Sequence, residues 1–497
     1  MRTRKSVLLV TVDCLRADHV GFMGYERPTT PFLDSLATEI CIVPTAIVAG
    51  VPTYFSLPAI LASRSPLSLG RDVLGLAPGE PTLASALQSA GYATGCFTAA
   101  NPYISPRFGY EQGFDKFRDF LENDVAASAG EEANSNTSSL ASRINRAMRK
   151  TRPAMGPLRR IYDDLYFEYC QRVTPVAPSL ESLRRFPSAD VIVDHAIDWI
   201  ASLRDAPFFL WLHFMDPHSP YYPKHAALSS LGRVAVTPKR TRYINSYWNR
   251  SDIDARRLRK YRGEIIDFYN AGVRWVDEQL KRLIGFLEPS NRWQDCIFVL
   301  TADHGEEFLD HGQRYHAPSH LPEELIRVPL LLRFPTSELP QQGSSPFNLI
   351  HLPPTLLELV GVEAPVEFQG RSQLKRLFSG QDFDGPAISE CIAGCTNPLR
   401  LESRSASRIL SIRESRYKLV LDFSSATEKL YDLQSDPGEQ SPLPKTVETG
   451  VRRRLLEVSR QHLRQLIEHR DPRARVRARL RELQLEWPRS SESVREV

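Results

Sequence analysis

Runs of apolar residues with no polar alternation recur along the chain, separated by stretches with helical spacing. The clearest runs are SVLLVTV (6–12), TGCFTA (94–99), PFFLWLHF (207–214), DCIFVLTA (295–302) and VPLLLRF (328–334). Such continuous runs are typical of strands that are buried on both faces. The segment 81–91 has helical spacing and ends in Gly91, a residue favoured just after a helix. This pattern predicts an α/β fold with a doubly wound, largely parallel sheet flanked by helices.

The pattern changes in three places. Residues 121–185 begin with the polar, low-complexity stretch AASAGEEANSNTSSLASR and are expected to form a flexible insertion in a main domain over 1–385. Shorter strand-like runs over 386–445 predict a small α+β subdomain with an antiparallel sheet. Residues 446–497 are rich in Arg and Glu with apolar residues at helical spacing, which predicts a basic helical tail. This tail either packs on its own domain or makes peripheral contact with an anionic surface.

Composition narrows the class of protein. The 497 residues are 42% hydrophobic and 25% charged, with a net charge of +4, so we expect a globular protein without a nucleic-acid partner. Seven scattered cysteines indicate free thiols rather than a disulfide framework. The apolar run near the N-terminus is short and lacks a cleavage site, and no stretch approaches the ~20 apolar residues of a transmembrane helix. We therefore expect a soluble, cytoplasmic protein. Its oligomeric state is not predicted.

Acidic residues directly follow two of the predicted strands. Asp13 follows the run 6–12, and Asp303 with His304 follows the run that ends at 302. Ligands of open α/β sheets bind beyond the carboxyl ends of the strands, so both points are expected at one crevice. An aspartate at such a position is also a common helix N-cap. Two such points, one with an adjacent histidine, favour a site for a divalent metal.

Histidines gather in two short segments that follow predicted strands. HFMDPHSPYYP supplies His213 and His218, and DHGEEFLDHGQRYH supplies His304, His311 and His316, which together are five of the twelve histidines. A single histidine is more often structural than functional. A cluster of this size can bind a metal, hold an oxyanion and protonate a leaving group.

Four blocks of the sequence resemble, in the same order, those of sulfatases in the alkaline phosphatase superfamily. They are VLLVTVDCLRADHVGFMGY, FTAANPYISPRFGYEQGFDKF, HFMDPHSPYYP and LTADHGEEFLDHG. SIRESRYKLVLDF and EKLYDLQSDPGEQ resemble the small terminal subdomain of the same family. The resemblance implies a metal-dependent hydrolase acting on a sulfate or phosphate ester of a small molecule or glycan. It also implies one divalent ion at Asp13, Asp303 and His304, with His218 at the ester oxygens. Calcium is the metal that the family implies, with manganese, magnesium and zinc as alternatives.

The nucleophile segment departs from that family. Sulfatases carry Cys/Ser-x-Pro-x-Arg, whose first residue is oxidised to formylglycine, whereas this chain has AGVPTYFSLPAILASRSP. One register places Gly50 at the nucleophile position and the other places Thr53 there, with Leu57 at the arginine position. We favour Thr53 because its hydroxyl then precedes a helix N-terminus, although it is also a plausible N-cap. Cys14 stands where many sulfatases have a second aspartate, and it either ligates a softer metal or faces away.

These departures favour a phosphate ester or phosphodiester over a sulfate ester. Threonine cannot become formylglycine, but its alkoxide can attack phosphorus or sulfur when a metal lowers its pKa. We therefore expect Thr53 as nucleophile and either His311 or His316 as the acid that protonates the leaving oxygen. One alternative is a phosphoryl or phosphoethanolamine transferase on the same site. Another is a catalytically silent binding protein that keeps the fold.

Overall fold

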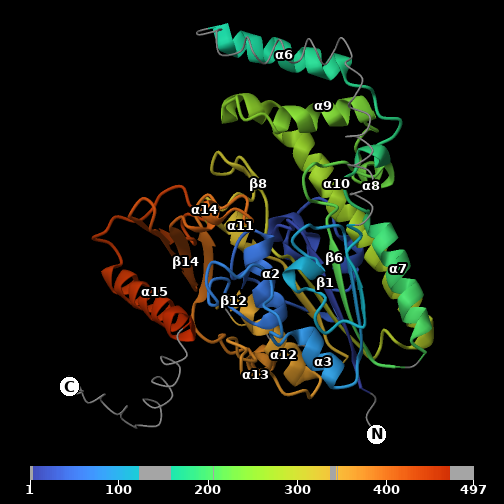
Figure 1. Ribbon diagram of the computed structural model, residues 1–497, viewed down its shortest axis with the longest axis vertical. Helices are drawn as coiled ribbons and strands as arrows, with labels where there is room; N and C mark the ends of the chain where they lie inside the picture. The colour runs from blue at the N-terminus through green and yellow to red at the C-terminus, as the bar shows by residue number, and fades with distance from the viewer. Residues whose placement is uncertain (1–3, 122–157, 205, 336–342, 344, 471–497) are drawn as a thin grey trace, which may run out of the picture.

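The computed structural model describes residues 4–121, 158–204, 206–335, 343 and 345–470. A seven-stranded sheet with the order β2-β11-β7-β1-β6-β4-β5 forms its centre (Figure 1). These strands are β1 (Ser6–Val12), β2 (Ile40–Ile42), β4 (Ala93–Thr98), β5 (Lys116–Arg118), β6 (Phe208–Phe214), β7 (Cys296–Thr301) and β11 (Leu330–Arg333). Strand β11 runs antiparallel to both of its neighbours, and the pairs β7-β1-β6-β4-β5 are all parallel. The predicted doubly wound, largely parallel sheet is confirmed.

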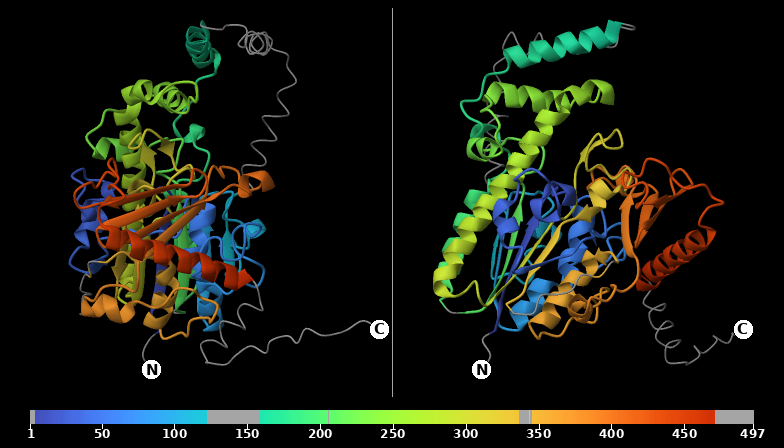
Figure 2. Two further views of the ribbon diagram at one scale, coloured as in Figure 1. Left: turned by 90° about the vertical axis from the view of Figure 1, so that its left-hand side faces the viewer. Right: turned by 180° about the vertical axis from the view of Figure 1, so that it is seen from behind.

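Helices cover both faces of this sheet, which gives three layers (Figure 2). One face carries α1 (Pro31–Ser35), α7 (Ala189–Ser202) and the long α10 (Ala255–Leu287). Helices α8 (His225–Ser230) and α9 (Pro238–Trp248) pack on α10, and α9 lies beyond the end of the sheet (Figure 1). The other face carries α2 (Thr53–Ala62), α3 (Leu83–Ser89), α12 (Leu352–Leu359) and α13 (Leu374–Ser379). Shorter elements complete the main part: β3 (Ala46–Ile47), β8 (Glu307–Phe308), β9 (Arg314–Tyr315), α11 (Glu323–Ile326), β10 (Arg327–Val328), β12 (Phe347–Asn348) and α14 (Leu401–Arg404).

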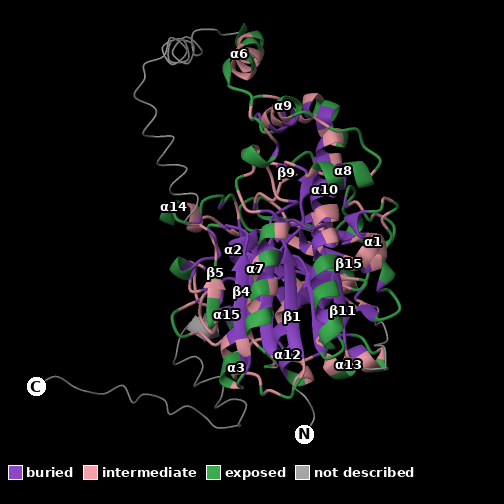
Figure 3. Ribbon diagram, turned by 90° about the vertical axis from the view of Figure 1, so that its right-hand side faces the viewer, coloured by how far each residue is buried: buried purple, intermediate pink, exposed green. Residues whose placement is uncertain are grey.

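The central strands are apolar along their whole length because neither face meets solvent. All seven residues of β1 and all seven of β6 are buried (Figure 3). Helix α10 packs closely against the loop that follows β6. A Cβ atom on Gly272 would lie 2.4 Å from the carbonyl oxygen of Asp216, so this approach requires glycine. The helix thereby fixes the loop that carries His218.

The C-terminal part of the chain forms a second, antiparallel sheet. Its order is β13-β14-β15-β16, with bounds Ala387–Ile392, Arg408–Glu414, Tyr417–Asp422 and Thr427–Asp432. Helix α15 (Thr449–Arg470) packs on β14 and β15 through a small core that includes Leu410, Leu419 and Leu455. The predicted antiparallel sheet is therefore confirmed. The limits proposed for the domains, 1–385, 386–445 and 446–497, stay predictions.

Two of the segments predicted from composition fall partly outside the described residues. Within the expected insertion 121–185, residues 122–157 lie outside them, and the described remainder includes helix α6 (Arg159–Val173). Helix α6 lies beside α9 at one end of the molecule, where the Tyr243 hydroxyl donates to Glu168 at 2.6 Å (Figure 1). Residues 471–497 of the basic tail also lie outside. None of the helices in the described part of the chain has the length and apolar character that crossing a bilayer requires.

Candidate active site

Adjacent parallel strands bring the predicted metal ligands together. Strands β7, β1 and β6 are neighbours in the sheet, so their carboxyl ends meet at one edge. Nε2 of His304 lies 3.7 Å from Oδ1 of Asp13 and 3.6 Å from Oδ2 of Asp303. His213, near the end of β6, places Nε2 3.4 Å from Oδ2 of Asp13. All four side chains are fully buried.

The two carboxylates perturb each other because both are buried. Burial raises the pKa of Asp303, and the neighbouring charge of Asp13 raises it further. Burial acts in the same direction on Asp13, but His218, then His213 and His304, outweigh it and lower the pKa of Asp13 well below its usual range. Two carboxylates held this close in a low-dielectric interior require compensating positive charge.

Buried atoms without partners indicate where a cation fits. Oδ2 of Asp303 and Nε2 of His213 have no hydrogen-bond partner among the described residues. Native proteins rarely leave buried polar atoms unpaired. Two carboxylates and an imidazole are a donor set for a divalent ion, and one atom each from Asp13, His213 and Asp303 lies within 4.8 Å of the others. The residues present therefore fit such an ion, and the ligand set Asp13, Asp303 and His304 stays a prediction.

Thr53 faces this group from the first position of α2. Its Oγ1 lies 3.2 Å from Nε2 of His304, and the residue lines an open cavity of about 360 Å³. Gly50 instead forms a bridge with Glu390, and a Cβ atom there would lie 2.7 Å from the Glu390 carbonyl oxygen. Gly50 is not among the described residues that line the cavity. The Thr53 register thus presents a hydroxyl to the site, at a helix end that favours an anion.

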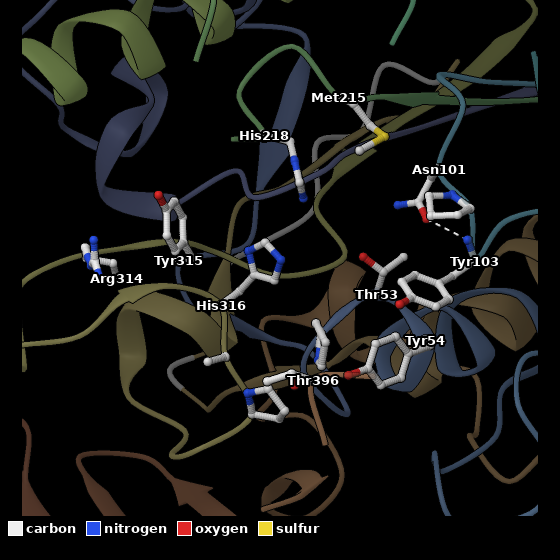
Figure 4. A pocket seen from close by; sticks show the side chains of 14 residues that line it. Thr53, Tyr54, Asn101, Tyr103, Met215, His218, Arg314, Tyr315, His316 and Thr396 are labelled. Atoms are coloured by element: carbon white, nitrogen blue, oxygen red, sulfur yellow. Dashed lines mark hydrogen bonds between the residues drawn. The ribbon is translucent and has the colours of Figure 1, made fainter. Parts of the chain in front are cut away.

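His218 and His316 line the same cavity as Thr53 (Figure 4). Their ring centroids are 5.1 Å apart, and those of His304 and His316 are 4.5 Å apart. Nδ1 of His218 lies 2.5 Å from the carbonyl oxygen of Ser219, so this nitrogen donates and Nε2 is left for a ligand. Nδ1 of His316 lies 3.2 Å from a carboxylate oxygen of Glu306. Burial raises the pKa of Glu306, but His316 outweighs this effect and lowers that pKa, so a charged carboxylate lies beside the ring.

His311 lies elsewhere, although it stands only five positions before His316 in the sequence. It occupies the turn between β8 and β9, and its Nε2 lies 3.1 Å from Oε2 of Glu324. Its Nδ1 lies 3.5 Å from Nε2 of Gln440, in the loop after β16. The structure therefore brings His316, and not His311, to the cavity.

Two further residues at the site, Asn101 and Glu306, were not predicted from the sequence to act there, whereas His213 was predicted only as a member of the histidine cluster. Asn101 donates from Nδ2 to Oδ2 of Asp13 at 3.0 Å. Glu306 supports His316 and accepts a hydrogen bond of 3.0 Å from the Tyr221 hydroxyl. Asn101 follows the end of β4 by three positions, so the rule that ligands bind at strand ends contained a signal for it.

Cys14 is turned toward the site rather than away from it. Its thiol lies 3.1 Å from Oδ1 of Asp13 and 3.4 Å from Nδ1 of His316. Burial, followed by the charges of Glu306 and Asp13, raises the pKa of the Cys14 thiol well above its usual range. The thiol is therefore protonated near neutral pH and donates a hydrogen bond to Asp13.

The chain matches two family profiles and several known proteins over much of its length. The sulfatase family profile matches residues 5–362, and the C-terminal profile of N-sulphoglucosamine sulphohydrolase matches residues 312–466. The multifunctional alkaline phosphatase superfamily protein PehA of Trinickia caryophylli is 23% identical, over 89% of this chain and 91% of its own length. Arylsulfatase K of Xenopus laevis is 27% identical, but the match spans only half of this chain and half of that relative.

Solved structures share the fold over nearly the whole chain. The phosphonate monoester hydrolase of Agrobacterium radiobacter superposes with a TM-score of 0.60 at 18% identity, over 94% of this chain and 96% of its own. A protein solved with its substrate D-glucosamine-2-N,6-O-disulfate superposes with a TM-score of 0.62 at 16% identity, over 94% of this chain and 98% of its own. Since the sulfatase profile covers well over half of the residues, the chain belongs to the sulfatase family of ester hydrolases, within the alkaline phosphatase superfamily.

Proposed function

We propose that this sulfatase-family hydrolase cleaves a singly charged phosphate ester, a phosphodiester, with Thr53 as the nucleophile. The observation that carries the proposal is the position of the Thr53 hydroxyl, which faces the cavity 3.2 Å from His304 and beside the buried carboxylates. The names of two relatives, a multifunctional alkaline phosphatase superfamily protein and a phosphonate monoester hydrolase, support chemistry at phosphorus.

The threonine favours phosphorus over sulfur as the centre that is attacked. Hydrated formylglycine carries a second hydroxyl on the same carbon, and this hydroxyl expels sulfate from the intermediate. Thr53 has one hydroxyl, so its ester is released only when water attacks the central atom. Phosphoryl esters of hydroxyl side chains are hydrolysed in this way in other enzymes. The side chain that replaces the oxidisable residue therefore predicts a phosphate ester as substrate.

The charge of the cavity favours an ester with a single negative charge. Among its described lining residues, the cationic or ionisable groups are His218, Arg314 and His316. A phosphodiester carries one negative charge at neutral pH, whereas a phosphate monoester carries nearly two. The buried carboxylates of Asp13 and Asp303 lie beside Thr53, so they repel an ester with two negative charges more strongly than an ester with one.

A divalent ion held by Asp13, Asp303 and His304 would lower the pKa of the Thr53 hydroxyl and screen the charge of the ester. The imidazole in this donor set suits zinc or manganese better than the calcium that the family resemblance implies.

The residues of the chain supply the remaining steps. The Thr53 proton leaves to water in the open cavity. Oγ1 of Thr53 then bonds to phosphorus while the bond to the leaving oxygen breaks, and the Nε2–H of a doubly protonated His218 ring donates to a non-bridging oxygen. Protonated His316 gives its proton to the leaving oxygen, so the alcohol departs neutral. Water next attacks phosphorus, its proton passes to His316, and the bond to Thr53 breaks as Oγ1 of Thr53 takes back a proton from water. The net reaction consumes one water and yields an alcohol and a phosphate monoester.

The test compares Thr53→Ala with Thr53→Ser and with Ser56→Ala. Ser56 is a matched control because it is a buried hydroxyl on the same helix, one turn further on. We expect Thr53→Ala to lower kcat/KM for bis(4-nitrophenyl) phosphate by about 10⁴-fold, Thr53→Ser to retain most activity, and Ser56→Ala to retain it. Mass spectrometry of acid-quenched wild-type enzyme should find a phosphorylated peptide that contains Thr53. Full activity of Thr53→Ala, or cleavage of 4-nitrophenyl sulfate in preference to the diester, would refute the proposal.

A further inference from the structure

The cavity extends away from Thr53 in two directions, which the proposed reaction alone does not explain. In Figure 4, Tyr54 and Tyr103 lie on one side of Thr53, and Arg314 lies on the other side, beyond His316. We call the part of the cavity at Tyr54 and Tyr103 its first arm and the part at Arg314 its second arm. An ester with one organic group would fill only one arm, because its anionic centre lies at Thr53. Two arms match an ester that carries an organic group on each side of phosphorus.

Two tyrosine rings form the first arm. The ring centroids of Tyr54 and Tyr103 are 4.9 Å apart, and the ring planes are inclined by 63°. The Tyr54 hydroxyl donates to the backbone oxygen of Cys395, and the backbone N–H of Tyr103 donates to Oδ1 of Asn101 at 3.0 Å. Both rings are therefore held in place. An aromatic group can pack against such rings at little entropic cost to the protein.

A guanidinium nitrogen without a hydrogen-bond partner among the described residues marks the second arm. Nη1 of Arg314 is buried and has no hydrogen-bond partner in the part of the chain that the structure describes. The guanidinium lies 5.7 Å from the ring centroid of Tyr315. No aspartate or glutamate is found among the described residues that line the cavity. A buried donor left unpaired costs free energy, and a carboxylate or phosphate is the group that matches the guanidinium.

Building on the proposed phosphodiester hydrolysis, we propose that the substrate is a diester whose leaving alcohol carries a second anionic group bound by Arg314, and whose retained group is aromatic and packs against Tyr54 and Tyr103. The leaving group is assigned to the Arg314 side because His316, the proton donor, lies between Thr53 and Arg314 (Figure 4). The aromatic group stays on phosphorus in the product.

Three chromogenic probes separate the two arms. They are phenyl 2-nitrophenyl phosphate, phenyl 4-carboxy-2-nitrophenyl phosphate and ethyl 2-nitrophenyl phosphate. The ratio of kcat/KM between the first two reports the anionic arm, and the ratio between the first and the third reports the aromatic arm. We expect Arg314→Gln to reduce the preference for the carboxylated leaving group by about tenfold and Arg314→Lys to restore part of it. Arg259→Gln, an exposed arginine on α10, should leave this ratio unchanged.

The aromatic arm is tested with Tyr103→Leu and its matched control Tyr103→Phe, which keeps the ring. We expect the leucine variant to reduce the preference for phenyl over ethyl by about threefold to tenfold and the phenylalanine variant to keep it. Cleavage of the diesters with both ratios unchanged in Arg314→Gln and Tyr103→Leu would overturn the assignment of the arms. Failure of the wild type to cleave any of the three probes would instead overturn the proposed function on which the assignment rests.

Discussion

Charged side chains are buried in two regions of the molecule, and the signs of the neighbouring charges differ between the two regions. At the strand ends, Asp13 and Asp303 lie together with like charge, and the ionisable side chain near both of them is a histidine, with Nε2 of His304 3.7 Å from Oδ1 of Asp13 and 3.6 Å from Oδ2 of Asp303. At the contact between the main part and the C-terminal sheet, Lys418 lies 2.8 Å from Oε1 of Glu439 and 3.3 Å from Oε1 of Glu323. There the charges are opposite, and each side chain has a counterion.

The strand ends thus hold a pair of like charges, whereas the contact at the C-terminal sheet holds a network of opposite charges. Burial raises the pKa of Glu323, but Lys418, followed by Arg413 and Arg327, outweighs it and lowers that pKa. Burial raises the pKa of both Asp303 and Glu439, but the first charged neighbour of Asp303 is Asp13, which raises that pKa further, whereas the first charged neighbour of Glu439 is Lys418, which opposes the rise. A carboxylate whose neighbours favour its charge stabilises the native state at neutral pH. One whose neighbours oppose its charge lowers stability until a cation binds.

The largest expected effect comes from Asp303→Asn, which removes a charge from the strand-end site. We expect kcat/KM to fall by about 10³-fold or more, with loss of bound metal measured by mass spectrometry. In chelator at pH 7, the free energy of unfolding should rise by about 1 kcal/mol, because repulsion with Asp13 is relieved. Exposed Asp198→Asn is the control. A variant that keeps its metal, or that is less stable than wild type in chelator, would contradict this view of the site.

The next largest effect is expected at the other region, from Lys418→Met. Removing the lysine leaves Glu323 and Glu439 buried without it, so the free energy of unfolding should fall by about 3–5 kcal/mol in urea titrations. Lys429→Met, on the neighbouring strand β16 and exposed, should change it little. Adding Glu323→Gln and Glu439→Gln to Lys418→Met should recover most of the loss. No recovery would indicate that packing of the lysine stem, and not its charge, supports this contact.

The sequence predicted the architecture of the sheet well because strands that are buried on both faces consist of continuous apolar runs. The apolar run 6–12 became β1 with the same bounds, and 295–302 became β7 with one residue fewer at each end. The rule that ligands bind at strand ends then predicted that Asp13 and Asp303 lie close together, although they are far apart in the sequence. That rule works because the carboxyl ends of parallel neighbours must share an edge.

The sequence could not distinguish between His311 and His316. Both follow Asp303 closely, and both belong to a histidine-rich segment. The hairpin formed by β8 and β9 separates them, since His311 lies at its turn and His316 follows the returning strand to the cavity. Two-residue strands leave almost no pattern in a sequence, because alternation needs four or more residues to be recognised. Side-chain direction in such loops depends on tertiary contacts, which also explains why Asn101 and Glu306 were missed.

The smallest expected effect is the pH dependence of the His311 contact, which sharpens the comparison because this ion pair is only partly buried and is not among the described residues that line the cavity. The hydrogen bond to Glu324 raises the pKa of His311 above its ordinary value of 6.5, against the opposing effect of burial. The protonated form thus favours the folded state. Its contribution is complete below pH 6.5 and is lost as the pH rises through the higher folded pKa. For this partly exposed pair we expect about 1 kcal/mol or less.

His311→Gln tests this contact and the assignment of the catalytic acid together. The free energy of unfolding should be lower than that of wild type at pH 6, and the difference should shrink by pH 9. His225→Gln, an exposed histidine on α8, should show no such convergence. Cleavage of the diester should stay within about threefold of wild type, whereas His316→Gln should lose about 10²-fold because it removes the proton donor. A large loss of activity in His311→Gln would mean that the hairpin turn affects the cavity. His311 would then have to be counted with the residues of the active site.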